Sequence, residues 1–177
     1  MEKPNLQQLA DQTINEFVAS AQKAFGENLV SALVFGSAAD SKLRATSDVN
    51  LMIVIKAFKK DDVDKLREPL RLGRALIQLH VMFVLESEIQ AATNAFTLKF
   101  ADIQVRHRLV FGKSPLVDIH PSRAELISKT KQALLNFQFK TREQYVLISL
   151  REEQLAIIVA DAASVLRSSA SALRQIE

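Results

Sequence analysis

The residues whose types and spacing could do chemistry lie between positions 36 and 50, in the stretch GSAADSKLRATSDVN. Gly36 and Ser37 end one short apolar run, and Asp48 opens another. Glycine lets the backbone come close to phosphate oxygens, and serine can donate from its hydroxyl and its N–H. A carboxylate such as Asp48 can ligate a magnesium ion that bridges those phosphates. The stretch therefore predicts a site for a nucleoside triphosphate.

The residue two places after Asp48 bears on how many metal ions such a site can hold. Residues i and i+2 of a strand point to the same face, so Asp48 and position 50 lie together. Two carboxylates there would hold the two ions of an in-line displacement. Position 50 is Asn50, whose amide oxygen can touch a metal but supplies no negative charge. We expect a weakened metal site.

The elements that must position these residues follow from hydrophobic spacing. Residues 5–25 have apolar side chains at three- and four-residue steps and predict a helix that stops at Gly26. Four short apolar runs predict strands, at 29–36, 50–58, 76–85 and 108–112. The charged segment before the third run predicts a solvent-facing helix with a turn near Gly73, and 86–105 is helical by pattern.

From Ser122 onward the chain contains neither glycine nor proline. Ser122 and Glu125 form the sequence of a capping box, which predicts the start of two long helices with a break near Ser149. Their many apolar residues must pack on each other, on the sheet or on another copy of the chain, which suggests a homo-oligomer. We expect an α/β fold with two domains: a short mixed sheet flanked by helices over residues 1–121, and a C-terminal helical pair over 122–177.

The stretch FGSAADSKLRATSDVNLMIV resembles the signature of the nucleotidyltransferase superfamily, which includes DNA polymerase β and the antibiotic nucleotidyltransferases. The signature consists of an apolar strand, Gly-Ser, a loop, and Ser-Asp-x-Asp before more apolar residues, and this chain departs from it only in having Asn50 at the last position. A second stretch, FTLKFADIQVRHRLVFGKSPL, is similar to a segment of a bacterial subgroup of these proteins that leads into a helical region. The resemblance covers roughly residues 29–150. Members of that subgroup usually extend further, which suggests a short version or a fragment.

The resemblance implies magnesium-dependent transfer of a nucleoside monophosphate from a nucleoside triphosphate to a hydroxyl acceptor. Gly36, Ser37 and Ser47 match motif positions that bind the nucleotide, and Asp48 and Asn50 match the catalytic, metal-binding pair. A third carboxylate usually follows on the next strand, where this chain has His80, and imidazole is a poor magnesium ligand. Asp102 is another candidate for that role.

Several of these residues also have ordinary structural explanations. His80 alternates with Gln78 and Met82 and could be a plain sheet histidine, and Asp48 could simply cap a turn. Lys42 and Arg44 could meet a triphosphate or could be solvated loop residues. The cluster from Arg106 to Arg108 could touch phosphate or an RNA backbone, or could be surface.

Two functions from different classes therefore stay open. The first is a slow nucleotidyltransferase that uses Asp48 with Asn50 as a neutral ligand. The second is a pseudoenzyme of the same fold, which senses a nucleotide or docks a partner through its C-terminal helices.

Composition narrows the remaining choices. The chain has no cysteine, which excludes a disulfide scaffold, a thiolate metal site and a cysteine nucleophile. Its net charge is +3 and its aromatic content 6%, so a nucleic-acid partner is not expected. The N-terminus lacks the apolar segment of a signal peptide, and no run of about 20 apolar residues could span a membrane. We expect a cytoplasmic protein without a membrane partner.

Overall fold

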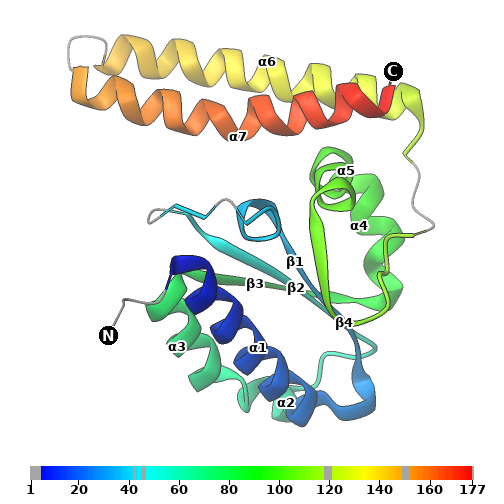
Figure 1. Ribbon diagram of the computed structural model, residues 1–177. Helices are drawn as coiled ribbons and strands as arrows, with labels where there is room; N and C mark the ends of the chain where they lie inside the picture. The colour runs from blue at the N-terminus through cyan, green and yellow to red at the C-terminus, as the bar shows by residue number, and fades with distance from the viewer. Residues whose placement is uncertain (1–4, 42, 45–46, 118–120, 149–151, 177) are drawn as a thin grey trace. The chain divides into compact units, whose positions relative to one another are not determined.

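The structure of the chain, a computed structural model, describes residues 5–41, 43–44, 47–117, 121–148 and 152–176 (Figure 1). The chain divides into two compact units. The sheet unit comprises residues 1–91 and 106–119, and the helical unit comprises 92–105 and 120–177. The segment 92–105 thus groups with the C-terminal helices, although it lies inside the region 1–121 predicted as one domain. Whether a domain ending at residue 121 folds independently stays a prediction.

The sheet unit is built on a mixed four-stranded sheet with the order β3-β2-β1-β4. The central strand β1 (Leu29–Phe35) pairs antiparallel with β2 (Val49–Ile55) and with β4 (His107–Gly112). β2 pairs parallel with β3 (Leu79–Leu85). The predicted α/β fold with a short mixed sheet is confirmed.

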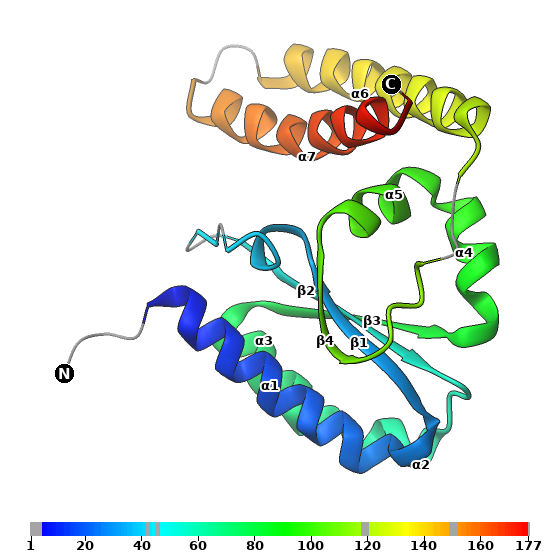
Figure 2. The same cartoon turned by 45° about the vertical axis from the view of Figure 1, so that its right-hand side comes forward.

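Two helices cover one face of this sheet (Figures 1 and 2). α1 (Leu6–Phe25) starts at Asn5, whose side chain accepts the N–H of Gln7, and turns its buried residues toward the sheet. The parallel β2 and β3 need a crossover, which α2 (Lys60–Asp64) and α3 (Arg67–Ile77) supply. The buried side chains of this layer include Ile14, Phe17, Val34, Leu51 and Ile53.

The turn predicted near Gly73 is wrong. Gly73 is a buried residue inside α3, and the helix continues to Ile77, where Gln78 ends it with a left-handed backbone at φ 51°. β3 consequently begins at Leu79 rather than at residue 76. A Cβ atom added at Gly73 would lie 2.7 Å from Cδ2 of Leu79, so glycine is present because α3 packs closely on the following strand.

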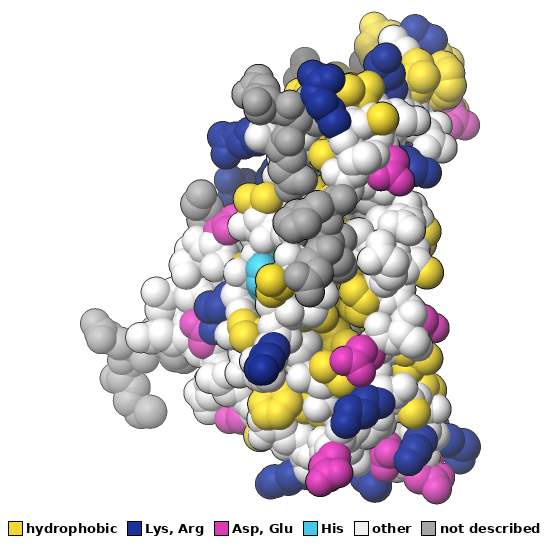
Figure 3. Space-filling view, turned by 90° about the vertical axis from the view of Figure 1, so that its right-hand side faces the viewer, with side chains coloured by type: hydrophobic (Ala, Val, Ile, Leu, Met, Phe, Trp, Pro, Cys, Tyr) yellow, Lys and Arg dark blue, Asp and Glu magenta, His cyan; other side chains and the backbone are white. Residues whose placement is uncertain are grey.

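The lower end of the sheet unit carries acidic and basic side chains side by side (Figure 3). In α2 and at the start of α3, Lys60 and Arg67 both pair with Asp64. Hydrogen bonds from Arg67, and then from Lys60, hold the pKa of Asp64 below its ordinary value. Such exposed pairs add little stability, and they balance the charge of this end.

The helical unit contains a pair of long antiparallel helices, α6 (Arg123–Ile148) and α7 (Glu152–Ile176), side by side in Figure 1. It also contains α5 (Thr97–Val105), which packs on α7, while α4 (Ile89–Ala95) spans the change from one unit to the other. The predicted break at Ser149 lies outside the described residues. The predicted capping box is present, because Ser122 and Glu125 exchange backbone-to-side-chain hydrogen bonds of 3.2 and 2.9 Å.

Candidate nucleotide site

The chain turns sharply directly after β1. Gly36–Ala38 form a single 3₁₀ turn, in which the Gly36 carbonyl accepts the N–H of Ala39 at 3.1 Å. Gly36 has φ +79°, a left-handed conformation that glycine adopts without strain. The first N–H groups of such a turn have no acceptor within it, so Ser37 presents its N–H and its hydroxyl at the end of the strand.

The N–H of Gly36 itself is already used, because it donates to the carbonyl of Arg106 at 3.2 Å. A Cβ at Gly36 would lie 3.9 Å from Nδ2 of Asn50, so the turn lies directly against the start of β2. Gly36 therefore contributes a backbone shape that brings the turn beside Asn50, and the phosphate-binding role of Gly36 and Ser37 stays a prediction.

Asp48, Asn50 and His80 gather next to this turn. Asp48 immediately precedes β2, and Asn50 lies opposite Phe35 of β1 and in register with His80 of β3. The Asp48 Oδ1 and His80 Nε2 atoms are 3.6 Å apart, with side chains 55% and 43% exposed. The structure thus brings together the motif residues of two strands, at a position open to solvent.

The loop before Asp48 is closed by a local turn. The Ser47 hydroxyl accepts the N–H of Arg44 at 3.1 Å, and the Ser47 N–H donates to the Arg44 carbonyl at 2.9 Å. Ser47 therefore shapes the approach to Asp48, and the Arg44 side chain is exposed. Lys42 lies outside the described residues. The nucleotide-binding roles of Ser47, Arg44 and Lys42 stay predictions.

One ion pair lies beside the turn and a second joins β4 to α1, and neither was predicted from the sequence. Arg106 donates from Nε and Nη2 to Oδ2 of Asp40, each at 2.8 Å, with the two side chains 16% and 28% exposed. Arg108 pairs with Asp11 of α1. The Gln7 amide of α1 also donates to the Ala38 carbonyl at 3.4 Å. The two arginines read as a phosphate-binding or surface cluster thus have carboxylate partners within the sheet unit.

Asp102, the alternative third carboxylate, belongs to α5 in the helical unit. Its Oδ1 accepts a hydrogen bond of 3.1 Å from the Ser171 hydroxyl of α7. This carboxylate is engaged in joining α5 to α7.

The side chains beside the turn offer few ligands for a metal ion, and the predicted magnesium site stays a prediction. Within the described ranges, no group of three or more His, Cys, Asp or Glu side chains could hold a metal ion. Asp48 and the Asn50 amide oxygen can serve one magnesium ion whose other ligands are phosphate oxygens and water, as is usual for this ion. A second ion would lack a carboxylate, because His80 offers only imidazole nitrogen.

The sheet order, the Gly-Ser turn and a likeness to a solved structure define the class: the chain has the nucleotidyltransferase fold. That structure is spectinomycin adenyltransferase from Enterococcus faecialis with ATP and spectinomycin. It shares 14% identity with this chain over 94% of this chain and 90% of its own length, with a TM-score of 0.53. At this identity the likeness establishes the fold alone.

Two further solved structures match the chain with lower TM-scores. A protein described as a nucleotidyltransferase from Sulfolobus solfataricus is 22% identical over 51% of this chain and 84% of its own, with a TM-score of 0.34. A toxin-antitoxin with AMP-PNP is 10% identical over 77% and 97%, with a TM-score of 0.38. No model of a known protein family matches the chain, and no curated protein does either. Across the described residues, no helix has the length and apolarity needed to cross a membrane.

Proposed function

We propose that the chain binds a nucleoside triphosphate beside the Gly36 turn and transfers its nucleoside monophosphate to a hydroxyl acceptor, with one magnesium ion. The observation that carries this proposal is the meeting of Asp48, Asn50 and the turn at one end of two adjacent strands. The fold and the motif agree with it. A single carboxylate implies slow turnover, because the charge of the transferred phosphate is neutralised only in part.

Each residue has a stated role in this proposal. Ser37 donates hydrogen bonds to phosphate oxygens from the start of the turn, and Arg106 holds the turn through its carbonyl and its guanidinium. Asp48 and the Asn50 amide oxygen hold the magnesium ion, which when bound shields the phosphate charge. His80 lies 3.6 Å from Asp48 and keeps that carboxylate beside β3.

The second candidate, a nucleotide-binding pseudoenzyme, is favoured by Asn50. The amide supplies no charge where a two-ion site needs a carboxylate, so binding can persist where turnover is lost. The two candidates make the same prediction for binding and opposite predictions for chemistry. A single set of variants can therefore separate them.

The test is a calorimetric titration of ATP, GTP, CTP and UTP into the protein, with and without magnesium. We expect magnesium-dependent binding of at least one nucleotide in the wild type. Asp48→Ala should abolish it, whereas Asp61→Ala, an exposed acid on α2, should not. Asn50→Asp should tighten magnesium binding by about tenfold, since it adds a second carboxylate. Absence of binding to all four nucleotides would overturn both candidates.

Release of pyrophosphate, measured with a panel of hydroxyl acceptors, then decides between transferase and pseudoenzyme. Turnover in the wild type that disappears in Asp48→Ala supports the transferase. Binding without turnover, with turnover gained in Asn50→Asp, supports the pseudoenzyme.

A further inference from the structure

Helix α7 carries two parallel stripes of small and apolar residues, and only one of them is buried. The buried stripe recurs at alternating three- and four-residue steps, the spacing of a helix that packs along another helix. Its half-buried and buried members are Leu155, Ile158, Ala162, Val165, Ser169 and Ala172. This stripe accounts for the packing of α7 within the helical unit.

The outer stripe consists of the residues that directly follow the buried ones and therefore has the same spacing. Its members are Ala156, Val159, Ala163, Leu166, Ala170 and Leu173, and all six are exposed. Val159 is 70% exposed, Leu166 51% and Leu173 52%. Single exposed apolar residues are ordinary, but six in a regular seam form a continuous apolar strip.

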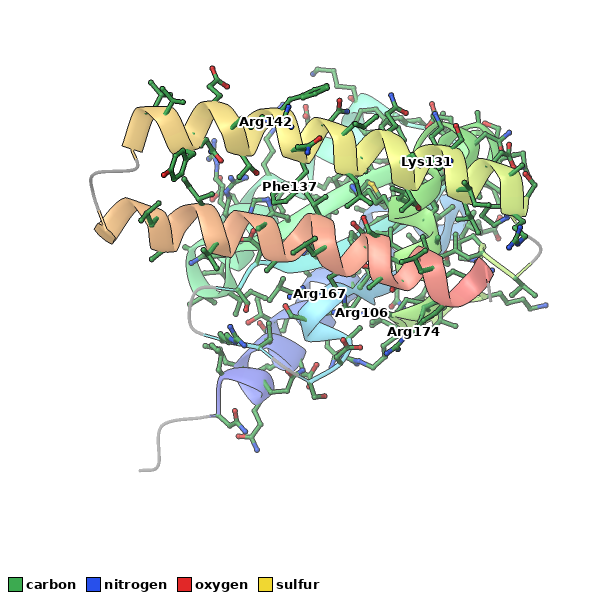
Figure 4. The ribbon with its side chains drawn as sticks, turned by 90° about the horizontal axis from the view of Figure 1, so that it is seen from above. Arg106, Lys131, Phe137, Arg142, Arg167 and Arg174 are labelled. Carbon is green, nitrogen blue, oxygen red and sulfur yellow. The ribbon has the colours of Figure 1, made fainter. Side chains whose placement is uncertain are left out.

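The charged neighbours of the outer stripe lie at its edge. Arg167 and Arg174 each follow a stripe leucine and lie along the side of α7 away from α6 (Figure 4). No stripe position is charged. An apolar centre with a charged rim is the composition of a protein–protein contact.

The order of large and small residues along the outer stripe identifies what covers it. We propose that a second copy of this chain packs there, with the two α7 helices antiparallel about a twofold axis. In one register, Leu166 faces Ala163 of the partner subunit. The same register places Leu173 opposite Ala156 and Val159 opposite Ala170, so every large residue meets an alanine.

This register has two physical consequences. Alanine opposite leucine lets the helix axes approach closely over the 18 residues from Ala156 to Leu173, about 26 Å of helix. The contact is also isologous, because each pair occurs twice, and it closes as a dimer. Two parallel α7 helices could place large residues opposite small ones only if one helix were shifted by three or four residues along the other. Such a shift would break the twofold symmetry.

Helix α6 borders the same surface. In two antiparallel helices, residues that follow the inward-facing positions point to the same side of the pair. On α6 the exposed residues at such positions are Lys131, Leu134, Gln138, Arg142 and Tyr145, of which Leu134 and Tyr145 are 38% and 62% exposed. The apolar contact is therefore centred on α7, and the mixed polar and apolar side of α6 lies along its border.

The first test is the mass of the full chain in solution, by light scattering or sedimentation. We expect a dimer for the wild type. Leu166→Ala leaves alanine opposite alanine and Ala163→Leu places leucine opposite leucine, so each should weaken the dimer by at least about tenfold. The double variant restores one large and one small residue per pair and should regain the dimer. Leu76→Ala, at an exposed leucine of α3, is the control and should leave the mass unchanged.

The second test measures the register directly, since the chain has no cysteine of its own. Ala156→Cys and Leu173→Cys are made as separate full-length proteins, mixed and oxidised. The antiparallel register predicts a crosslink in the mixture and none in either protein alone, because like positions lie about 25 Å apart. A crosslink of Ala156→Cys to itself would overturn the proposal. So would a wild type that stays monomeric, or a double variant that fails to recover while its circular dichroism matches the wild type.

Discussion

At the scale of single residues, Arg106 carries more of the site than its sequence context suggests. Its carbonyl accepts the Gly36 N–H and its guanidinium binds Asp40, so it holds both ends of the turn. Both side chains of the ion pair are largely buried. Without the guanidinium, the negative charge of the Asp40 carboxylate would lack its ion-pair partner at a position that is partly shielded from water.

We therefore expect Arg106→Gln to lower the free energy of unfolding by about 1–3 kcal/mol. Urea denaturation measures this change. Asp40→Asn combined with Arg106→Gln should lower it by less than the sum of the single variants, since the double variant leaves no unpaired charge. Additive losses would show that the two side chains do not act together.

The residues of the motif could be predicted from the sequence, but the ion pair that lies beside the turn could not. Asp48 and Asn50 share a face because strands alternate, and His80 joins them because β3 pairs in register with β2. The Asp40 and Arg106 pair joins residues 66 positions apart. Nothing in the local sequence indicates this ion pair, because the basic cluster from Arg106 to Arg108 is equally typical of a solvent-exposed surface.

At the scale of elements, two glycines are explained by the packing of neighbouring elements and not by the local sequence pattern. Glycine weakens helices, so the sequence predicts a turn near Gly73, yet Gly73 lies inside α3 and allows that helix to pack against Leu79. Gly112, at the end of β4, has φ +75°, and a Cβ there would lie 2.1 Å from the Val30 carbonyl oxygen. That clash is with backbone, which cannot move aside as a side chain can.

Gly112→Ala should therefore destabilise the fold by about 3 kcal/mol or more, through strain at positive φ and through the clash. Gly26→Ala is the matched control, since Gly26 has φ +52° and no atom within 4 Å of the added Cβ. Its backbone, at φ 52° and ψ −126°, also disfavours a side chain, so Gly26→Ala should cost about 1–3 kcal/mol, from strain without a clash. Thermal unfolding compares the two, and equal losses would mean that the strand edge yields to the new methyl group.

The cap of α6 makes a prediction for pH. The Ser122 hydroxyl, and then its backbone N–H, lower the pKa of Glu125. A lowered carboxyl pKa stabilises the fold above the unfolded value of about 4.3, and this contribution is lost as the pH falls through the folded pKa. In Ser122→Ala the pKa of Glu125, followed by NMR titration, should rise toward its ordinary value. Ser128→Ala, farther along the same helix, should leave it unchanged.

At the scale of the whole molecule, the chain enters the helical unit twice and leaves it once, between residues 105 and 106. The segment 92–105 is placed between β3 and β4 in sequence, yet Ala101 of α5 is buried with Leu126 and Ala172 of the long helices. The sequence-based boundary at residue 121 follows the change in composition and not these contacts. Hydrophobic pattern marks where helices begin, but it does not say which helices pack together.

A fragment of residues 1–121 should consequently expose the apolar side of α5, including Leu98 and Ala101. We expect it to bind a hydrophobic dye strongly and to unfold at a lower temperature than the full chain. A fragment as stable as the full chain, without dye binding, would contradict this and would establish residues 1–121 as an independent domain.

The pairing of β1 also bears on the order in which the molecule folds. Phe35 pairs with Asn50 across a short loop, but with His107 only after 71 residues of intervening chain. Closing the longer loop requires more conformational entropy to be lost before any contact forms. We therefore expect β4 to join last, together with Arg106. The strand expected to complete the sheet is thus also the one that fixes the Gly36 turn, and we expect a newly made chain to acquire its candidate nucleotide site only at the end of folding.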